Sequence, residues 1–120
     1  MSDFKIPKVY LDIINQVFEL EKKAAALQEP HSLQRNINKL KDILEHDMLS
    51  LAGKDDAGLV YHNPLGEPYD ITRTDCDASI AGDTTGNLYI TEVIKPIVRY
   101  KQGPLHLIVQ KGIVVATTQP

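Results

Sequence analysis

The sequence predicts an α+β protein in which an antiparallel helical hairpin is followed by a small all-β domain. Up to Leu51 the chain has no glycine, and its apolar residues recur at spacings of three and four. From Gly53 onward, seven glycines and five prolines separate short apolar runs rich in β-branched residues. We therefore expect two domains, with residues 1–52 forming a helical hairpin and residues 53–120 forming a small β-domain.

The first helix is expected from Ile6 or Pro7 to Leu27. Pro7 suits the first helical turn, where its missing N–H costs nothing. A heptad seam over three repeats is formed by Ile6, Tyr10, Ile13, Val17, Leu20, Ala24 and Leu27. Further apolar residues widen this face beyond the seam of a two-stranded coiled coil, which favours a four-helix bundle. Glu21-Lys22-Lys23 is expected to be a solvated face of this helix.

The second helix is expected from Leu33 to Ser50 or Leu51. Pro30 prevents the first helix from continuing, and Ser32 is a suitable N-cap for the second. The apolar positions of this helix are Leu33, Ile37, Leu40, Ile43, Leu44, Met48 and Leu51. Because the connection is short, the two helices are expected to form an antiparallel hairpin.

The apolar faces of this hairpin are too wide for two helices to cover. A second copy of the chain would cover them by forming a homodimeric four-helix bundle. The residues expected at the dimer interface are Ile13, Val17, Leu20, Ile37, Leu40 and Leu44. Packing of the hairpin onto the chain's own β-region is the alternative.

The second half reads as short strands separated by turns. Strands are expected at residues 59–61, 88–94, 97–100, 105–109 and 113–116. Asn63–Gly66 predicts a turn, because Asn caps it, Pro fixes φ and Gly supplies a positive φ. The stretch from Thr72 to Gly86, rich in Asp, Thr and Gly, is expected to be a loop. The pattern predicts a small antiparallel sheet or sandwich.

Composition argues against several classes of partner and location. The net charge of −3 and the pI near 5.7 disfavour binding to the phosphate backbone of nucleic acids. No run of 18 apolar residues predicts a membrane span, and the first residues do not read as a signal peptide. A single cysteine fits a reducing, cytoplasmic setting.

The sequence carries no motif of an enzyme, a cofactor site or a metal site. Cys76 lies between Asp75 and Asp77, whose negative charge disfavours the thiolate. The four histidines have spacings that match no metal motif; they are His31, His46, His62 and His106. No phosphate-binding loop, dinucleotide fingerprint or nucleophile elbow occurs. We therefore expect a protein that acts by binding.

The segment NPLGEPYD carries the most specific motif of the chain, formed by Asn63, Pro64, Gly66, Tyr69 and Asp70. The motif resembles the Asn-Pro-x-Gly-x-x-Phe-Asp signature of the GrpE family. The order of parts is similar to that family from about Pro7 to Ala116, and Thr91–Ile94 is similar to one of its strands. The family's long stalk helix has no counterpart here. Ile71, Thr74, Asp75 and Cys76 replace its Pro and His-Glu-Ala, and Val109–Gly112 replaces its Leu-Arg-Pro-Ala.

This resemblance implies a co-chaperone of protein folding and the stress response. A GrpE-like β-domain binds the nucleotide-binding domain of a DnaK-type heat-shock chaperone and promotes ADP release as a nucleotide exchange factor. The expected contact residues, which lie at or beside exposed turns, are Arg99, Tyr100, Lys101, Gln110 and Lys111. The alternative is a divergent interaction module that keeps the fold but lacks exchange activity and acts as an adaptor.

Overall fold

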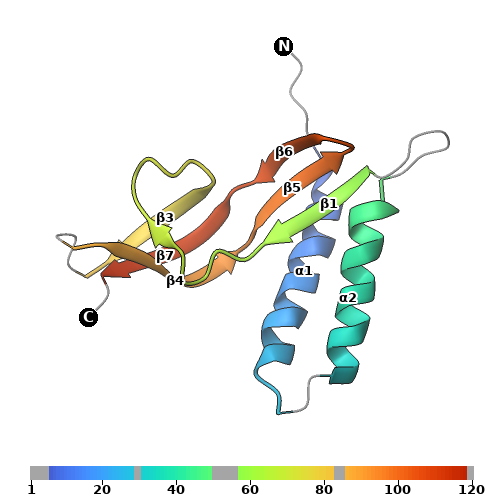
Figure 1. The fold of residues 1–120 in the computed structure, drawn as a ribbon, viewed down its shortest axis with the longest axis horizontal. Coiled ribbons are helices and arrows are strands. Elements are labelled where there is room, and N and C mark those ends of the chain that lie inside the picture. The colour runs from blue at the N-terminus through green and yellow to red at the C-terminus, as the bar shows by residue number, and fades with distance from the viewer. Residues whose placement is uncertain (1–5, 29–30, 50–56, 83–85, 119–120) are drawn as a thin grey trace. The chain divides into compact units, whose positions relative to one another are not determined.

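The computed structural model describes residues 6–28, 31–49, 57–82 and 86–118. In these residues two helices are followed by seven strands, which confirms the predicted α+β class with a helical hairpin before a β-rich region (Figure 1). The second helix ends at His46 and residues 47–49 form a turn, so the expectation that this helix continues to Ser50 or Leu51 is wrong; those two residues lie outside the described residues.

Helix α1 spans Lys8–Ala25, with Pro7 immediately before it. Its first turn is closed by the amide of Tyr10, which donates to the carbonyl of Pro7 at 3.0 Å. At the other end the amide of Leu27 donates to the carbonyl of Ala24, three residues back, at 3.1 Å. The helix therefore ends two residues before the predicted Leu27, in a tighter turn.

Helix α2 spans His31–His46. The prediction that Ser32 caps this helix is wrong, because Ser32 already lies in the first turn. A helix does not use its first four N–H groups internally, so the first turn tolerates a polar residue at this position. At the carboxyl end, the amides of Asp47 and Met48 both donate to the carbonyl of Ile43 at 2.9 Å and close the helix.

The strands form two sheets (Figure 1). A three-stranded sheet has the order β1-β5-β6, and a four-stranded sheet has the order β2-β4-β7-β3. The strands are β1 (Ala57–His62), β2 (Pro68–Tyr69), β3 (Cys76–Ala81), β4 (Leu88–Lys95), β5 (Ile97–Gln102), β6 (Leu105–Gln110) and β7 (Gly112–Thr118). The five predicted strands all appear, each one or more residues longer than expected.

Strand β3 corrects two expectations. It lies inside the stretch Thr72–Gly86, which was expected to be a loop, and it pairs with β7 in parallel from Cys76 opposite Gly112 to Ala81 opposite Thr117. The sheet is therefore mixed and not purely antiparallel. Ile80 is the one strongly strand-favouring residue of β3, so pairing with β7 determines its conformation more than its own composition does.

Contacts divide the chain into two compact units. Unit 1 comprises residues 1–61 and 99–109, and unit 2 comprises residues 62–98 and 110–120. These limits differ from the expected domains 1–52 and 53–120, because β1, most of β5 and most of β6 belong to the same unit as the helices. The change in composition near residue 53 marks a change of secondary structure within unit 1.

The core of unit 1 is formed by both helices and β1. Ile14, Phe18 and Leu59 are at most 1% exposed. At Gly58 the β1 backbone lies so close to α2 that an added Cβ would stand 2.1 Å from the carbonyl oxygen of Glu45. Any side chain would clash there. The hairpin thus covers one of its apolar faces with the chain's own strands, the alternative that the sequence left open.

The core of unit 2 lies along β4 and β7. Its buried apolar residues are Ile90, Val93, Ile97, Val98, Val114 and Ala116. The register of β4 against β7 shifts twice, between Ile90 and Glu92 and between Val93 and Lys95. Such bulges bend a strand and increase its twist. The buried Pro96 separates β4 from β5.

Candidate functional site

In unit 1 the Glu21 carboxylate joins both helices to β1. The Tyr61 hydroxyl donates to Glu21 Oε1 at 2.6 Å, and Gln34 Nε2 donates to Oε2 at 2.9 Å. Lys41 Nζ lies 3.3 Å from both carboxylate oxygens. The expectation of a solvated Glu21 is therefore wrong, because this side chain is only 28% exposed. Its neighbour Lys22 lies 5.2 Å above the Phe18 ring.

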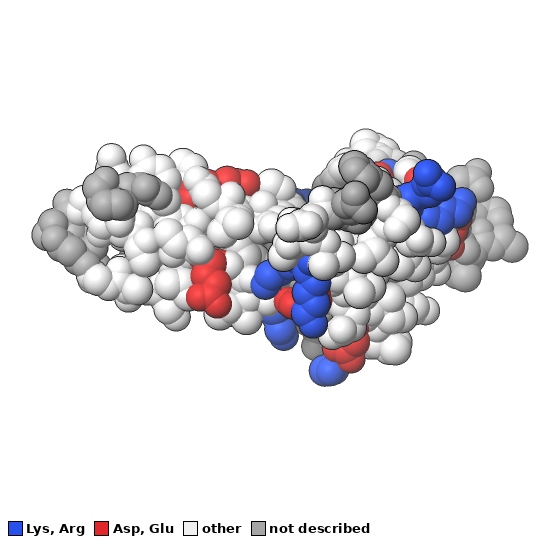
Figure 2. All heavy atoms as spheres, turned by 90° about the horizontal axis from the view of Figure 1, so that it is seen from below, with Lys and Arg blue, Asp and Glu red and all other residues white. Residues whose placement is uncertain are grey.

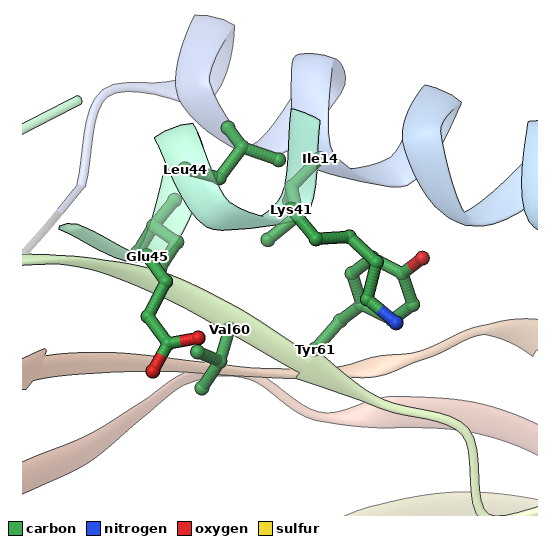
Figure 3. Close-up of a pocket in the computed structure, with 7 residues that line it drawn as sticks. Ile14, Lys41, Leu44, Glu45, Val60 and Tyr61 are labelled. Atoms are coloured by element: carbon green, nitrogen blue, oxygen red, sulfur yellow. The ribbon is translucent and has the colours of Figure 1, made fainter. Parts of the chain in front are cut away.

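A small cavity lies beside this network, between α1, α2 and β1 (Figure 3). Figure 3 shows Lys41 extending over the Tyr61 ring, with Nζ 5.0 Å from the ring centre. The Glu45 side chain points away from the Tyr61 ring. The other lining residues are Ile14, Leu44, Leu59 and Val60. The cavity volume of about 110 Å³ is well below the several hundred Å³ typical of pockets for small molecules.

The polar groups around this cavity satisfy one another. Glu45 forms an ion pair with Lys101 at 3.1 Å. Burial, together with the neighbouring Glu21 carboxylate, raises the pKa of Tyr61 far above its usual value. The Tyr61 hydroxyl therefore stays protonated and cannot serve as a base. Although burial alone would raise it, the pKa of Glu21 is lowered by hydrogen bonds from Tyr61, Gln34 and Lys41. We interpret this network as structural and not as a catalytic centre.

In unit 2 residues 63–75, which begin with the motif residues 63–70, fold into a tight corner. Asn63 Oδ1 accepts from the amide of Leu65 at 3.2 Å, and the carbonyl of Pro64 accepts from the amide of Glu67 at 3.0 Å. Gly66 has φ +85°, which confirms the positive φ expected from the sequence. The Gly66 amide donates to the Ile90 carbonyl at 2.8 Å, and the Ile90 amide donates to the Glu67 carbonyl at 2.9 Å. These two hydrogen bonds attach the corner to β4.

Arg73 fixes the carboxyl-terminal part of this corner through hydrogen bonds. Its Nε donates to Asp75 Oδ1 at 2.6 Å, its Nη2 to Glu67 Oε1 at 2.8 Å and its Nη1 to the carbonyl of Pro68 at 3.1 Å. The Arg73 side chain is only 18% exposed. The second oxygen of Glu67 lies 2.5 Å from His62 Nε2. The planar guanidinium thereby fixes three chain positions at once, which a lysine could not do.

These contacts set the charge state of the corner. Hydrogen bonds from Arg73 lower the pKa of Asp75, and hydrogen bonds from Arg73 and His62 lower that of Glu67 against the opposing effect of burial. Burial, reinforced by Asp75, raises the pKa of the Cys76 thiol to about 11. The thiol is therefore protonated near neutral pH, in agreement with the expectation that Cys76 is a poor nucleophile.

An open groove runs beside this corner. It has a volume of about 470 Å³ and is formed by residues 68–71 on one side and 86–89 on the other. Leu65 and Ile71 expose 55% and 91% of their surface on the corner. The outer edge of β2 offers no pairing site at Pro68, because proline has no N–H and the Pro68 carbonyl is bound by Arg73. A partner would therefore bind here through side chains.

The five expected contact residues divide between the two units. Lys101 is only 13% exposed because it binds Glu45, and the Tyr100 hydroxyl donates to Gln102 at 2.9 Å. In unit 2, Gln110 Nε2 donates to the carbonyl of Pro96 at 3.0 Å, and Lys111 lies 4.0 Å from Asp77. Arg99 is partly buried in β5. Lys111 is the most exposed of the five and the one most available to a partner.

The six expected dimerisation residues separate into two groups. Val17, Ile37 and Leu44 are each 4% exposed in the core of unit 1, whereas Ile13, Leu20 and Leu40 are 40% exposed or more. Periodicity did not distinguish the groups because both faces of the helices are apolar. The exposed group continues with Leu27 just after α1 and with Leu33 and Ile43 on α2.

Sequence reasoning missed the central residues of both polar networks. Glu21 and Tyr61 are 40 positions apart, and no local pattern connects them. Arg73 gave a weak signal, since it is the one basic residue between Glu67 and Asp75. Within the described ranges, no group of three or more His, Cys, Asp or Glu side chains converges on a possible metal position.

Comparison with known proteins adds no family. No protein-family model matches this sequence, and the searches of curated proteins and of solved structures found no significant match. Neither described helix combines the length and apolar character needed to cross a bilayer. On the face shown in Figure 2, most of the surface is uncharged, and the Lys and Arg side chains form small groups beside Asp or Glu.

Proposed function

We propose that this chain is a GrpE-like co-chaperone that acts in the cytoplasm. It binds the nucleotide-binding domain of a DnaK-type chaperone and promotes release of ADP, without chemistry of its own. The observation that supports this most is the corner at residues 63–75. Its backbone is fixed by Arg73 and Ile90, yet it exposes Leu65 and Ile71. Fixed backbone with exposed apolar side chains suits docking, because little entropy is lost on binding.

The proposed mechanism is a shift of populations. A β-domain that binds the open form of the nucleotide cleft better than the closed form favours the open form and weakens ADP binding. Reciprocity requires that nucleotide weaken the binding of this chain by the same factor. A coupling of about 1–3 kcal/mol, or roughly 5- to 150-fold, is typical of such linkage.

The proposal includes a homodimer formed through the exposed apolar side chains of the hairpin. Each is between 39% and 50% exposed: Ile13 and Leu20 on α1, Leu27 just after α1, and Leu33, Leu40 and Ile43 on α2. They differ from the residues that pack against β1, so a dimer can form without opening unit 1. Burial of each side chain would contribute roughly 1–2 kcal/mol, since about half of each is already covered.

Light scattering tests the dimer directly. The expected mass is twice 13.4 kDa, and the double variant Leu20→Lys with Leu40→Lys is expected to be monomeric, because charges in an apolar interface are costly. Ala25→Lys, at an exposed position of α1, is the control that should remain dimeric. A wild-type protein that stays monomeric at high concentration would contradict the dimer.

The adaptor function is the second candidate, and the ion pair of Lys101 with Glu45 favours it. An expected contact residue that is bound within its own unit is not available to a chaperone. In this case the chain would bind a partner without changing nucleotide affinity. Binding and exchange must therefore be measured separately.

Release of labelled ADP from a DnaK-type chaperone of the source organism tests the proposal. We expect this chain to accelerate release, and Ile71→Ser to reduce the effect while Thr74→Ser, a matched exposed change, leaves it intact. Binding without acceleration would support the adaptor function. Neither binding nor acceleration with any such chaperone of that organism would reject the exchange function.

A further inference from the structure

The groove between residues 68–71 and 86–89 contains one charged side chain, Asp70. Asp70 Oδ1 accepts hydrogen bonds from the amide of Thr72 at 2.8 Å and from the Thr72 hydroxyl. A further backbone hydrogen bond to Asp70 comes from the amide of Arg73. The Thr72 hydrogen bonds lower the pKa of Asp70, so the carboxylate is ionised at neutral pH. The groove therefore presents a fixed negative charge on an exposed side chain.

The surroundings of Asp70 increase this negative charge. Glu67, Asp70 and Asp75 provide three carboxylates around the single guanidinium of Arg73. Arg73 also attracts Asp70, but its guanidinium is hydrogen-bonded to Glu67 and Asp75. Counting only Arg, Asp and Glu, one positive charge against three negative charges gives this corner a formal charge of −2. An anionic ligand would be repelled here, and a cation would be attracted.

The other walls of the groove include aromatic and apolar side chains beside the polar Asn87. Tyr69 and Tyr89 are half-buried residues of β2 and β4, and Leu88 and Ile71 lie along the same groove. An uncharged apolar ligand would cover the Asp70 carboxylate without pairing it, which costs free energy. A lysine or arginine side chain avoids this cost, because its methylene groups contact apolar walls while its charged end reaches the carboxylate. Tyrosine rings add a cation–π attraction.

We propose that this groove binds a lysine or arginine side chain of a partner protein, with a neighbouring apolar residue of the partner packed on Ile71. Ile71 exposes 91% of its surface at the rim, next to Asp70 in the chain. The closed edge of β2 at Pro68 excludes strand addition at that position, so recognition depends on side chains. The inference rests on the proposed function only in assuming a protein partner, and it specifies the chemistry of that partner's segment.

Nuclear magnetic resonance titration with short blocked peptides tests the groove. The probes are acetyl-Leu-Arg-Leu-amide and its neutral match acetyl-Leu-Gln-Leu-amide. We expect the arginine peptide to shift the amide resonances of Gly86, Asn87 and Tyr89, and to bind about tenfold more tightly than the glutamine peptide, as suits a charge-assisted pair. Equal affinity for the two peptides, or shifts elsewhere only, would overturn the proposal.

Two variants separate the groove from general electrostatic attraction. Asp70→Asn keeps the side-chain oxygen that accepts from Thr72 but removes the charge, so it should abolish the preference for arginine. Asp77→Asn removes an equally charged carboxylate that is 66% exposed on β3 and should leave the preference unchanged. If both variants reduce it equally, the attraction is nonspecific and the groove is not the site.

The peptide titration and the ADP-release measurement fail independently. Selective binding of the arginine peptide without any chaperone response would leave the groove supported and reject the exchange function. Accelerated ADP release with no peptide preference would support the exchange function and reject this groove as its contact. Asp70→Asn in the ADP-release assay then tests whether the chaperone itself uses the groove.

Discussion

In unit 1 a carboxylate joins three chain segments, and in unit 2 a guanidinium does the same. Glu21 binds side chains of α2 and β1 above an apolar core that includes Phe18 and Leu59. Arg73 binds Glu67, Pro68 and Asp75 around a corner whose large apolar side chains, Leu65 and Ile71, are exposed. The comparison indicates that the polar network supplements apolar packing in unit 1 and substitutes for it in the corner of unit 2.

The largest effect is expected where packing dominates. Gly58→Ala would place a Cβ 2.1 Å from the Glu45 carbonyl oxygen, which belongs to backbone and cannot rotate away. We expect a loss of at least about 3 kcal/mol in the free energy of unfolding, measured by urea denaturation. Gly103→Ala is the control: Gly103 has φ +58° and no atom within 4 Å of an added Cβ. The control should cost about 1–2 kcal/mol, and equal losses would contradict the packing argument.

The next effect concerns Arg73. Arg73→Met keeps much of the volume but leaves Glu67 and Asp75 without their cation, so we expect a loss of about 2 kcal/mol at neutral pH. Arg73→Lys should recover only part of it, because an ammonium group lacks the planar fork. Lys95→Met, at an exposed position of β4, should change stability by less than about 0.5 kcal/mol.

The pH dependence of stability gives a second test of the Arg73 prediction. The folded-state pKa values of Glu67 and Asp75 are lowered, so their contribution is present above the unfolded pKa values, near 4. It is lost as pH falls through the folded values. The wild type should therefore lose stability below about pH 4 faster than Arg73→Met, and the two unfolding curves should converge. A constant difference from neutral to acid pH would mean that Arg73 does not stabilise the fold through the charges of Glu67 and Asp75.

The smallest effect is expected from the network of unit 1. Tyr61→Phe keeps the ring contact with Phe18 at 5.7 Å and removes only the hydrogen bond to Glu21. A loss of about 1 kcal/mol is expected in the free energy of unfolding. The folded pKa of Tyr61 is raised, so its contribution is complete below the unfolded pKa near 10 and disappears as pH rises through the folded value.

Alkaline titration checks this sign. Tyrosinate absorbance of the folded wild type should show one tyrosine that resists ionisation, and Tyr61→Phe should remove that one. Stability should fall more steeply above about pH 10 in the wild type than in the variant. If all five tyrosines ionise together in the folded wild type, the Tyr61–Glu21 hydrogen bond does not persist in solution.

Local signals predicted much of the fold. Periodicity located both helices, and the turn chemistry of Asn63, Pro64 and Gly66 predicted the corner that the structure contains. Periodicity could not tell which apolar face of the hairpin packs against β1, because Val17 and Leu20 are equally apolar. Strand β3 was missed because its conformation depends on pairing with β7. The paired residues Cys76 and Gly112 are more than 30 positions apart in the sequence.

The candidate sites were harder to predict than the fold. The groove combines residues 68–71 with residues 86–89, and only the pairing of β2 with β4 brings these segments together. Tyr69 and Asp70 were already identified as motif residues, but nothing local assigned Tyr89 to the same surface. Lys101 looked exposed because it follows a strand near a turn, yet Glu45 on a distant helix binds it.

The path of the backbone through the two units has a consequence for dissecting the protein. The chain passes from one unit to the other between residues 61 and 62, between 98 and 99 inside β5, and between 109 and 110 near the end of β6. Neither unit is one uninterrupted stretch of polypeptide. Removing the hairpin would strip β1 and its sheet of their helical cover, so the β-rich half is not expected to survive as a fragment. An experiment that grafts either unit onto another protein would therefore have to transfer the whole chain.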